Sequence, residues 1–272
     1  MGMKSAAGLN VRAGAVAVCG LVTLTSCGSG PTEGGGPQDD LRQLFRIRWS
    51  PPSASDAGDG GHAFLLDRPG SQPLALTAYH VAGPVGATPD LGVPTAWLRS
   101  PVNPSIVIRL GARLPIPGAR TISSAGSQDD MAAFEVMDWD PSRALELAAD
   151  LPSPGDTVWV LAVHTGDGPA NGPRRHPARV AVAHDSALVY SYLASANTNG
   201  SSGAAVLDRD GRVVGVNVGT LIMTPESWQR FRDRYGPCCE AVAGNEVVGL
   251  AVGVRSIRRH LAVLGLPTPG GQ

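Results

Sequence analysis

The feature that most limits the fold is the way glycine and proline divide the chain into short apolar runs. The chain has 272 residues, of which 35 are glycine and 23 are proline. Between these turn-forming residues lie short runs rich in Val, Leu and Ala, such as 157–163 and 187–192. Short β-branched runs bounded by turns are typical of strands in sandwiches and barrels. The sequence therefore predicts an all-β fold.

Composition and charge limit the classes of function. Of the residues, 43% are hydrophobic and 17% are charged, and the formal net charge is −1. A chain of this size can bury a sizeable core as one domain or as two small lobes. Because the charge is nearly balanced and no basic cluster occurs, we do not expect nucleic acid as a partner. The sequence contains no zinc-type cysteine spacing and no phosphate-binding loop, so we expect neither a metal nor a cofactor.

A serine between glycines is the first candidate for chemistry. The segment Gly200-Ser201-Ser202-Gly203 reads Gly-x-Ser-Gly, and a hairpin-like run follows from Ala205. A serine hydroxyl is a weak nucleophile near neutral pH, so it needs a base to take its proton and donors to hold the oxyanion. Glycine two positions before the serine lets backbone N–H groups converge on one point. The motif is common in loops and gains meaning only with its partners.

A histidine and an aspartate lie at the edges of two other β-like runs. His80 follows the run Leu76-Thr77-Ala78-Tyr79, and Asp130 precedes the run 131–136. Taken singly, a histidine at a strand end is usually structural, and an aspartate that opens a strand usually serves a turn. The order His, Asp, Ser along the chain is one of the known arrangements of a nucleophilic triad. Together, the three residues predict catalysis.

Three blocks of the sequence resemble the signature blocks of trypsin-like serine proteases with the chymotrypsin fold: 76–81, 130–134 and 200–203. A fourth block, 249–254 followed by 255–261, is similar to the last barrel strand and the closing helix of the bacterial, HtrA-like branch. The resemblance covers roughly residues 44–264, and we expect no PDZ domain after it. It implies two antiparallel six-stranded β-barrels with a short C-terminal helix and with the triad in the cleft between the barrels.

The resemblance also implies a role for each site residue. His80 would accept the proton of Ser202, and Asp130 would fix the imidazole. The backbone N–H groups of Gly200 and Ser202 would form the oxyanion hole. Asp129 competes with Asp130 for the role of the acid, but only Asp130 aligns with the family block.

Ser201 competes with Ser202, but only Ser202 has both the preceding and the following glycine.

Four positions depart from relatives. Ser201 stands where digestive enzymes carry an acid, so activation by cleavage is not expected. Ala196 replaces the acid of trypsin-like Arg/Lys specificity. Tyr79 is bulky beside the histidine, and Val218 stands where many relatives place Ser or Thr.

We expect strands in short runs along both lobes and a helical or loop connection between them. In the first lobe these runs are 45–49, 61–66, 75–78, 105–110 and 132–136, the connection is 141–152, and in the second lobe the runs are 156–163, 178–182 and 187–192, followed by the serine loop and its hairpin. A helix is expected from Thr224-Pro225-Glu226, which offers an N-cap hydroxyl, proline in the first turn and then an acid. Trp228, Phe231 and Tyr235 recur on it at helical spacing. We expect them to pack on the barrel, with a wall of the substrate cleft as the alternative.

The N-terminus has the pattern of an export signal. Lys4 and Arg12 precede an apolar stretch, 13–25, that is too short to cross a bilayer. The export signal ends in Leu24-Thr25-Ser26-Cys27, which resembles the lipobox of bacterial lipoproteins. In that motif the cysteine is lipidated. An ordinary signal peptide with a chance cysteine is the alternative. Gly28 follows, which in a Gram-negative cell would imply sorting toward the outer membrane.

The expected organisation has five segments. These are a signal peptide at 1–26, a flexible Gly/Pro-rich tether at 27–43, a first barrel at 44–150, a second barrel with the closing helix at 151–264, and a disordered tail at 265–272. Cys238 and Cys239 are the remaining cysteines of the exported chain. A strained disulfide between these neighbours and two free thiols are both open.

The function expected from these features is that of an exported, lipid-anchored serine endopeptidase. Its partners would be polypeptide substrates and, through Cys27, a membrane of the bacterial cell envelope. Two alternatives belong to other classes: a catalytically idle binding protein on a protease scaffold, and an esterase, which the same chemistry permits.

Overall fold

The structure is a computed structural model that describes residues 38–48, 61–82, 96–121, 128–163, 173–185, 187–193, 200–235 and 247–266, with side chains left out at 38–40 and 235. The expectations for Cys27, for Cys238 and Cys239, for the signal peptide and for Ala196 fall outside these residues. Within the described part of the chain, no helix has the length and apolar character needed to cross a membrane.

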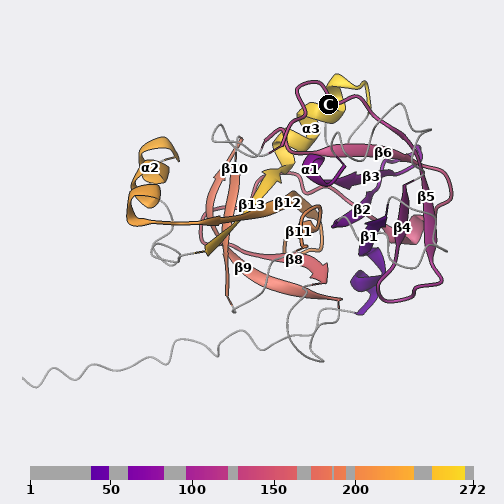
Figure 1. Ribbon diagram of the computed structural model, residues 1–272, viewed down its shortest axis with the longest axis horizontal. Helices are drawn as coiled ribbons and strands as arrows, with labels where there is room; N and C mark the ends of the chain where they lie inside the picture. Colours follow the sequence, from indigo (N-terminus) through magenta and orange to yellow (C-terminus); the bar gives the residue numbers. More distant parts are fainter. Residues whose placement is uncertain are drawn as a thin grey trace, which may run out of the picture. The chain divides into compact units, whose positions relative to one another are not determined.

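Six antiparallel strands close a first barrel (Figure 1). They are β1 (Phe45–Arg48), β2 (His62–Leu66), β3 (Leu74–Thr77), β4 (Trp97–Arg99), β5 (Val107–Arg113) and β6 (Ala132–Val136). Their order is β1-β4-β5-β6-β3-β2, and a pairing of β1 with β2 completes the ring. A two-residue strand, β7 (Ala144–Leu145), adds to β2 in parallel.

Six further strands close a second barrel. They are β8 (Thr157–Val163), β9 (Pro173–His184), β10 (Ala187–Tyr192), β11 (Ala205–Leu207), β12 (Val213–Ile222) and β13 (Val247–Gly253). The ring runs β10-β13-β12-β11-β8-β9, and all its pairings are antiparallel. The predicted fold of two six-stranded antiparallel barrels is confirmed.

Helical segments are short and lie between or after the strands. They are η1 (Gln38–Gln43), α1 (Tyr79–Ala82), η3 (Pro141–Arg143), α2 (Pro225–Tyr235) and α3 (Val254–Val263). α3 is the predicted C-terminal helix. α2 begins as predicted, because the hydroxyl of Thr224 accepts a hydrogen bond from the N–H of Ser227. Trp228 is buried and packs edge-on against Phe231, whereas the side chain of Tyr235 is not described.

Three elements differ from the expectation. The segment 38–43, assigned to the tether, forms η1, and Leu41 packs against the core. β4 was not predicted, because three residues carry too little periodicity to be read as a strand. The connection 141–152 contains the expected helical turn, which Asp140 caps by accepting from the N–H of Ser142, but it also contributes β7.

Each barrel has its own core, and a third apolar cluster joins the two. Residues from all six strands of the first barrel fill its interior, and the second barrel is filled in the same way. The strands that face the other barrel are buried on both sides. On β3, for example, Ala75 points into the barrel, whereas Leu74 and Leu76 join a cluster that also includes Val216 and Val252 of the second barrel. This explains why those strands read as continuous apolar runs rather than as alternating ones.

Candidate active site

The pairing of two strands brings His80 and Asp130 together. β3 and β6 are antiparallel neighbours, with Thr77 opposite Ala132. His80 lies just after β3, in the short helix α1, and Asp130 lies just before β6. Because antiparallel neighbours place the end of one strand beside the start of the other, the two residues meet although they are 50 positions apart.

Asp130 holds His80 through both its backbone and its ring. Nδ1 of His80 lies 3.0 Å from Oδ2 and 3.2 Å from Oδ1 of Asp130, and the backbone N–H of His80 donates to Oδ1 at 3.0 Å. The carboxylate side chain is fully buried, whereas the imidazole is 31% exposed. An ionised carboxylate only accepts hydrogen bonds, so the proton of the neutral ring belongs on Nδ1. Nε2 is then left with a lone pair, as a general base requires.

Glycines shape the turn that carries Ser202. Gly200 and Gly203 have φ of +80° and +85°, in the left-handed region that glycine adopts without strain. A Cβ on Gly203 would overlap the carbonyl oxygen of His62 and the hydroxyl of Thr77. Gly203 is therefore required for conformation and for space.

The two serines of this turn face different surroundings. Ser201 is fully buried, and its hydroxyl and its carbonyl oxygen accept hydrogen bonds from the amide of Asn217 at 2.9 and 2.8 Å. Ser202 is half-buried, and its hydroxyl makes no hydrogen bond to any residue that the structure describes, His80 included. Of the two, Ser202 has the hydroxyl that is available for chemistry.

Gly61 brings the nucleophile turn close to the helix of the histidine. A Cβ on Gly61 would lie 2.7 Å from the carbonyl oxygen of Ser202 and 3.0 Å from a methyl group of Val81. Gly61 is therefore enclosed between the residue after His80 and the proposed nucleophile. The structure brings His80 and Asp130 into direct contact, and it contains no hydrogen bond between His80 and Ser202.

Two backbone donors of the turn have no acceptor among the residues that the structure describes. In the described part of the chain, neither the N–H of Gly200 nor that of Ser202 donates a hydrogen bond. The N–H of Gly203, by contrast, donates to the carbonyl oxygen of Asn217 at 2.7 Å. Donors that are held in place but unused are what an oxyanion hole needs.

Asn217 supports the turn from inside the second barrel. Its amide binds Ser201, its backbone N–H donates to the carbonyl oxygen of Ala204 at 2.8 Å, and its Oδ1 accepts from the phenol of Tyr190 at 2.6 Å. Burial raises the pKa of Tyr190 well above its usual value. Asn217 was not among the predicted site residues, although one asparagine inside the apolar run of β12 is a signal for a buried polar contact.

His62 supports the same turn from the first barrel. Its backbone N–H donates to the carbonyl oxygen of Ser202 at 2.7 Å, and its ring Nδ1 lies 2.6 Å from the carbonyl oxygen of Gly200. It was not among the predicted site residues. No local pattern marks it, because its partner Gly200 lies 138 positions away.

Asp129 has partners other than the candidate base. Its carboxylate pairs with the guanidinium of Arg120 at 2.9 Å and lies 3.7 Å from Nε2 of His260 on α3. His260 also contacts the carbonyl oxygen of Gln128 at 2.9 Å, which ties α3 to the segment before Asp130. This geometry favours Asp130 over Asp129 as the acid.

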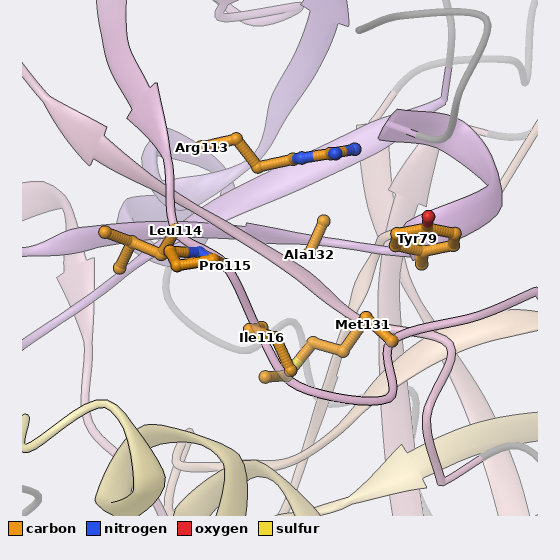
Figure 2. Close-up of a pocket in the computed structure, with 8 residues that line it drawn as sticks. Tyr79, Arg113, Leu114, Pro115, Ile116, Met131 and Ala132 are labelled. Atoms are coloured by element: carbon orange, nitrogen blue, oxygen red, sulfur yellow. The ribbon is translucent and has the colours of Figure 1, made fainter.

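A small cavity of about 110 Å³ is lined by Tyr79, which precedes His80 in the sequence, and by residues of the segments 113–119 and 131–132 (Figure 2). Tyr79 and Arg113 stand on its wall, with the guanidinium 5.6 Å from the centre of the ring. Arg113 also donates to the carbonyl oxygen of Ala82 at 3.1 Å, so it ties both ends of α1 to β5. The bulk of Tyr79, which the sequence marks as a departure, is accommodated by this contact.

Two other expectations concern the surroundings of the acid and the absence of metal. Val218 is buried and offers no hydroxyl to Asp130. No group of three or more potential metal ligands occurs among the residues for which the structure gives positions.

Comparison with known proteins identifies a family whose model matches this chain. The family model described as a trypsin-like peptidase domain matches residues 61–216, more than half of the chain. This range includes His80, Asp130 and the turn 200–203. No curated protein sequence is similar enough to count as a match.

Solved structures share the fold at low identity. The active form of the Rv3671c protease from M. tuberculosis is 17% identical, with a TM-score of 0.52 and with 85% of each chain covered. Neuropsin, a serine protease of mouse brain, is 10% identical, with a TM-score of 0.56, 84% of this chain covered and 96% of neuropsin. A serine endoprotease from Yersinia pestis is 15% identical, with a TM-score of 0.50, 87% of this chain covered and 68% of that one. At such identities the likeness shows the fold alone.

Proposed function

We propose that this chain, which belongs to the trypsin-like peptidase family, hydrolyses peptide bonds through an acyl-enzyme formed on Ser202. The observation that carries the proposal is the bond between the His80 ring and the buried carboxylate of Asp130. It leaves Nε2 of the imidazole able to accept a proton, beside a turn that presents one available serine hydroxyl. Family membership indicates the reaction, and His80, Asp130 and Ser202 are the residues that would carry it out.

The first half of the reaction uses the base and the backbone donors. The Ser202 hydroxyl adds to the substrate carbonyl carbon while its proton passes to Nε2 of His80, which becomes an imidazolium next to Asp130. The carbonyl oxygen becomes an oxyanion, which the N–H groups of Gly200 and Ser202 would hold. When the C–N bond breaks, His80 returns the proton to the leaving amine and the acyl group stays on the serine.

The second half repeats these steps with water. His80 takes a proton from water, the resulting hydroxide attacks the ester carbon, and the proton returns to Ser202 as the acid leaves. The contact between Ser202 and His80 has to form in this cycle. Catalytic hydrogen bonds are often long in the empty enzyme and shorten when substrate binds.

An active-site phosphonate tests the proposal. Full-length wild-type protein should be labelled covalently, the Ser202→Ala variant should not, and Ser201→Ala should keep its label in so far as it folds. Failure to label folded wild type would favour the idle binding protein. Turnover of matched peptide and ester libraries separates peptidase from esterase, since the peptidase should cleave both.

The substrates and the location are part of the same proposal. We infer export from the apolar stretch after Arg12 and attachment to the cell envelope through a lipidated Cys27. Several acyl chains on one residue would make that attachment durable. The substrates would then be proteins outside the cytoplasm. Incorporation of a labelled fatty acid into wild type but not into Cys27→Ser would support the anchor, and an unlabelled wild type would exclude it.

A further inference from the structure

His62 is a fully buried histidine that links three parts of the molecule. It lies on β2 of the first barrel. Its ring Nδ1 is 2.6 Å from the carbonyl oxygen of Gly200, and its ring Nε2 is 3.0 Å from the backbone N of Val163 on β8 of the second barrel. Its own carbonyl oxygen accepts from the hydroxyl of Thr77 at 2.7 Å.

These partners fix the protonation of the ring. The N–H of Val163 can only donate, so Nε2 has to accept and carries no proton. Nδ1 then carries the proton of the neutral imidazole and donates to the carbonyl oxygen of Gly200. A protonated ring carries hydrogen on both nitrogens, so it could not accept a hydrogen bond from the N–H of Val163. The contacts therefore fit the neutral form with hydrogen on Nδ1.

The contacts of His62 determine the direction of the turn's peptide groups. Its ring holds the carbonyl of Gly200, and its backbone N–H holds the carbonyl of Ser202 at 2.7 Å. The carbonyl between them, that of Ser201, is held by Asn217. In a trans peptide the N–H points opposite to the preceding C=O, so Asn217 orients the N–H of Ser202. His62 holds the Gly200 residue whose own N–H is the second unused donor.

We propose that His62 is a positioning residue of the oxyanion hole, which as a neutral imidazole ties the Gly200 carbonyl to the Val163 N–H of the second barrel. This deepens the function proposed above and rests on it. A displacement of Gly200 would move its N–H away from the developing oxyanion, and catalysis depends on donors whose geometry is set in advance. The residue acts through Gly200 and does not touch the substrate.

Three substitutions separate the two ring bonds. His62→Ala removes both of them. His62→Asn keeps an amide N–H close to the place of Nδ1 and can still donate to Gly200. His62→Gln carries its amide near the place of Nε2 and can still accept from Val163. The control is His184→Asn, an exposed histidine at the end of β9 that lies outside the nucleophile turn.

Kinetics of the folded full-length variants give the first result. For His62→Ala we expect kcat for a peptide and the rate of phosphonate labelling to fall by about tenfold to 100-fold, with KM changed by less than about threefold. His62→Asn should recover most of this loss, whereas His62→Gln should not, even if both melt at the same temperature. His184→Asn should match wild type. Equal rates for wild type and His62→Ala, or rescue by Gln and not by Asn, would overturn the inference.

The tautomer of His62 gives a second result that needs no catalysis. In nitrogen-15 spectra of wild type labelled at histidine, the resonances that His62→Asn removes should show hydrogen on Nδ1 and a bare Nε2. Hydrogen on Nε2 would overturn the inference in any case. If wild type fails to react with the phosphonate but shows this tautomer, and if His62→Ala speeds amide exchange at Gly203, the proposed function fails while the positioning of the turn by His62 stands.

Discussion

The phenol oxygen of Tyr190 lies 2.6 Å from Oδ1 of Asn217 and donates a hydrogen bond to it in the interior of the second barrel. This bond fixes the orientation of the Asn217 side-chain amide, because Oδ1 accepts from the phenol and Nδ2 donates to Ser201. Tyr190 itself is in place because β13 has glycine at position 249, where a Cβ would overlap the ring. The nucleophile turn is therefore anchored to the core through side chains that never meet the substrate.

Replacing Tyr190 by phenylalanine should weaken this anchor. The ring would still fill its site, but Oδ1 of Asn217 would lose its buried donor, at a cost of about 1–3 kcal/mol in the free energy of unfolding. Urea denaturation measures the loss. Tyr79→Phe is the control, since the Tyr79 hydroxyl has no hydrogen-bond partner among the described residues, and its effect should be close to zero. Equal effects of the two substitutions would contradict the role given to Tyr190.

Gly203 should not tolerate a side chain. In Gly203→Ala the new methyl group would overlap the carbonyl oxygen of His62, which is backbone and cannot rotate away, and the residue would also be held at φ +85°. We expect a loss of more than about 3 kcal/mol in the free energy of unfolding, or failure to fold.

A second left-handed glycine separates space from conformation. Gly70 has φ +72°, but a Cβ at this position would have no other atom within 4 Å, so Gly70→Ala should cost only about 1 kcal/mol of backbone strain. Thermal melts of the two variants compare them directly. A similar loss in both would mean that the backbone conformation, not the contact with His62, makes Gly203 necessary.

The contact between His80 and Asp130 could be foreseen because it depends on strand order. Both residues flank short apolar runs, and once those runs pair as antiparallel neighbours the side chains have to meet. The number and antiparallel pairing of the strands followed from the family resemblance, whereas alternation alone gave only an all-β class. The turn 200–203 was marked by its glycines, whose left-handed conformation the structure shows at Gly200 and Gly203.

The support of the turn could not be foreseen in the same way. His62 and Asn217 act through contacts with residues far away in sequence or across a barrel, and no local spacing encodes such contacts. β4 was missed because its strand character comes from its two neighbours, β1 and β5, rather than from its own three residues. Leu41 was assigned to a tether because the composition around it is polar, although it packs against the core.

Asp130→Asn should abolish most of the catalysis and leave the fold in place. An amide can donate to Nδ1, which would then give up its proton to Nε2 and place the wrong tautomer before Ser202. In a comparable triad this change lowers kcat by about 10⁴-fold, and we expect a loss of that order. Asp129→Asn is the control, because that carboxylate pairs with Arg120 and not with His80, and its kcat should stay within about threefold of wild type. A large loss in both variants would mean that Asp129 shares the role of the acid.

Alkaline pH should destabilise the protein through the tyrosines of β10. Tyr192 is half-buried with its hydroxyl enclosed, and burial raises its pKa to about 12 from an ordinary value of 10.0. As the pH rises between these values, the unfolded chain loses the phenol proton while the folded chain retains it. The unfolded state then binds fewer protons, so the free energy of unfolding falls as the pH rises. The stabilisation is complete below pH 10 and is lost as the pH passes through the pKa of the folded state.

The neighbouring Tyr190, whose ring stands edge-on to that of Tyr192 at 5.7 Å, adds to the same fall, since burial raises its pKa well above the usual value. Urea denaturation at a series of alkaline pH values measures this slope in wild type and in Tyr192→Phe. The variant should show a smaller slope above pH 10 because one of the two buried phenols is gone. Ultraviolet titration of the folded protein should show the matching loss of one late-ionising tyrosine. An unchanged slope in Tyr192→Phe would mean that its phenol ionises without cost to the fold and that burial does not protect it.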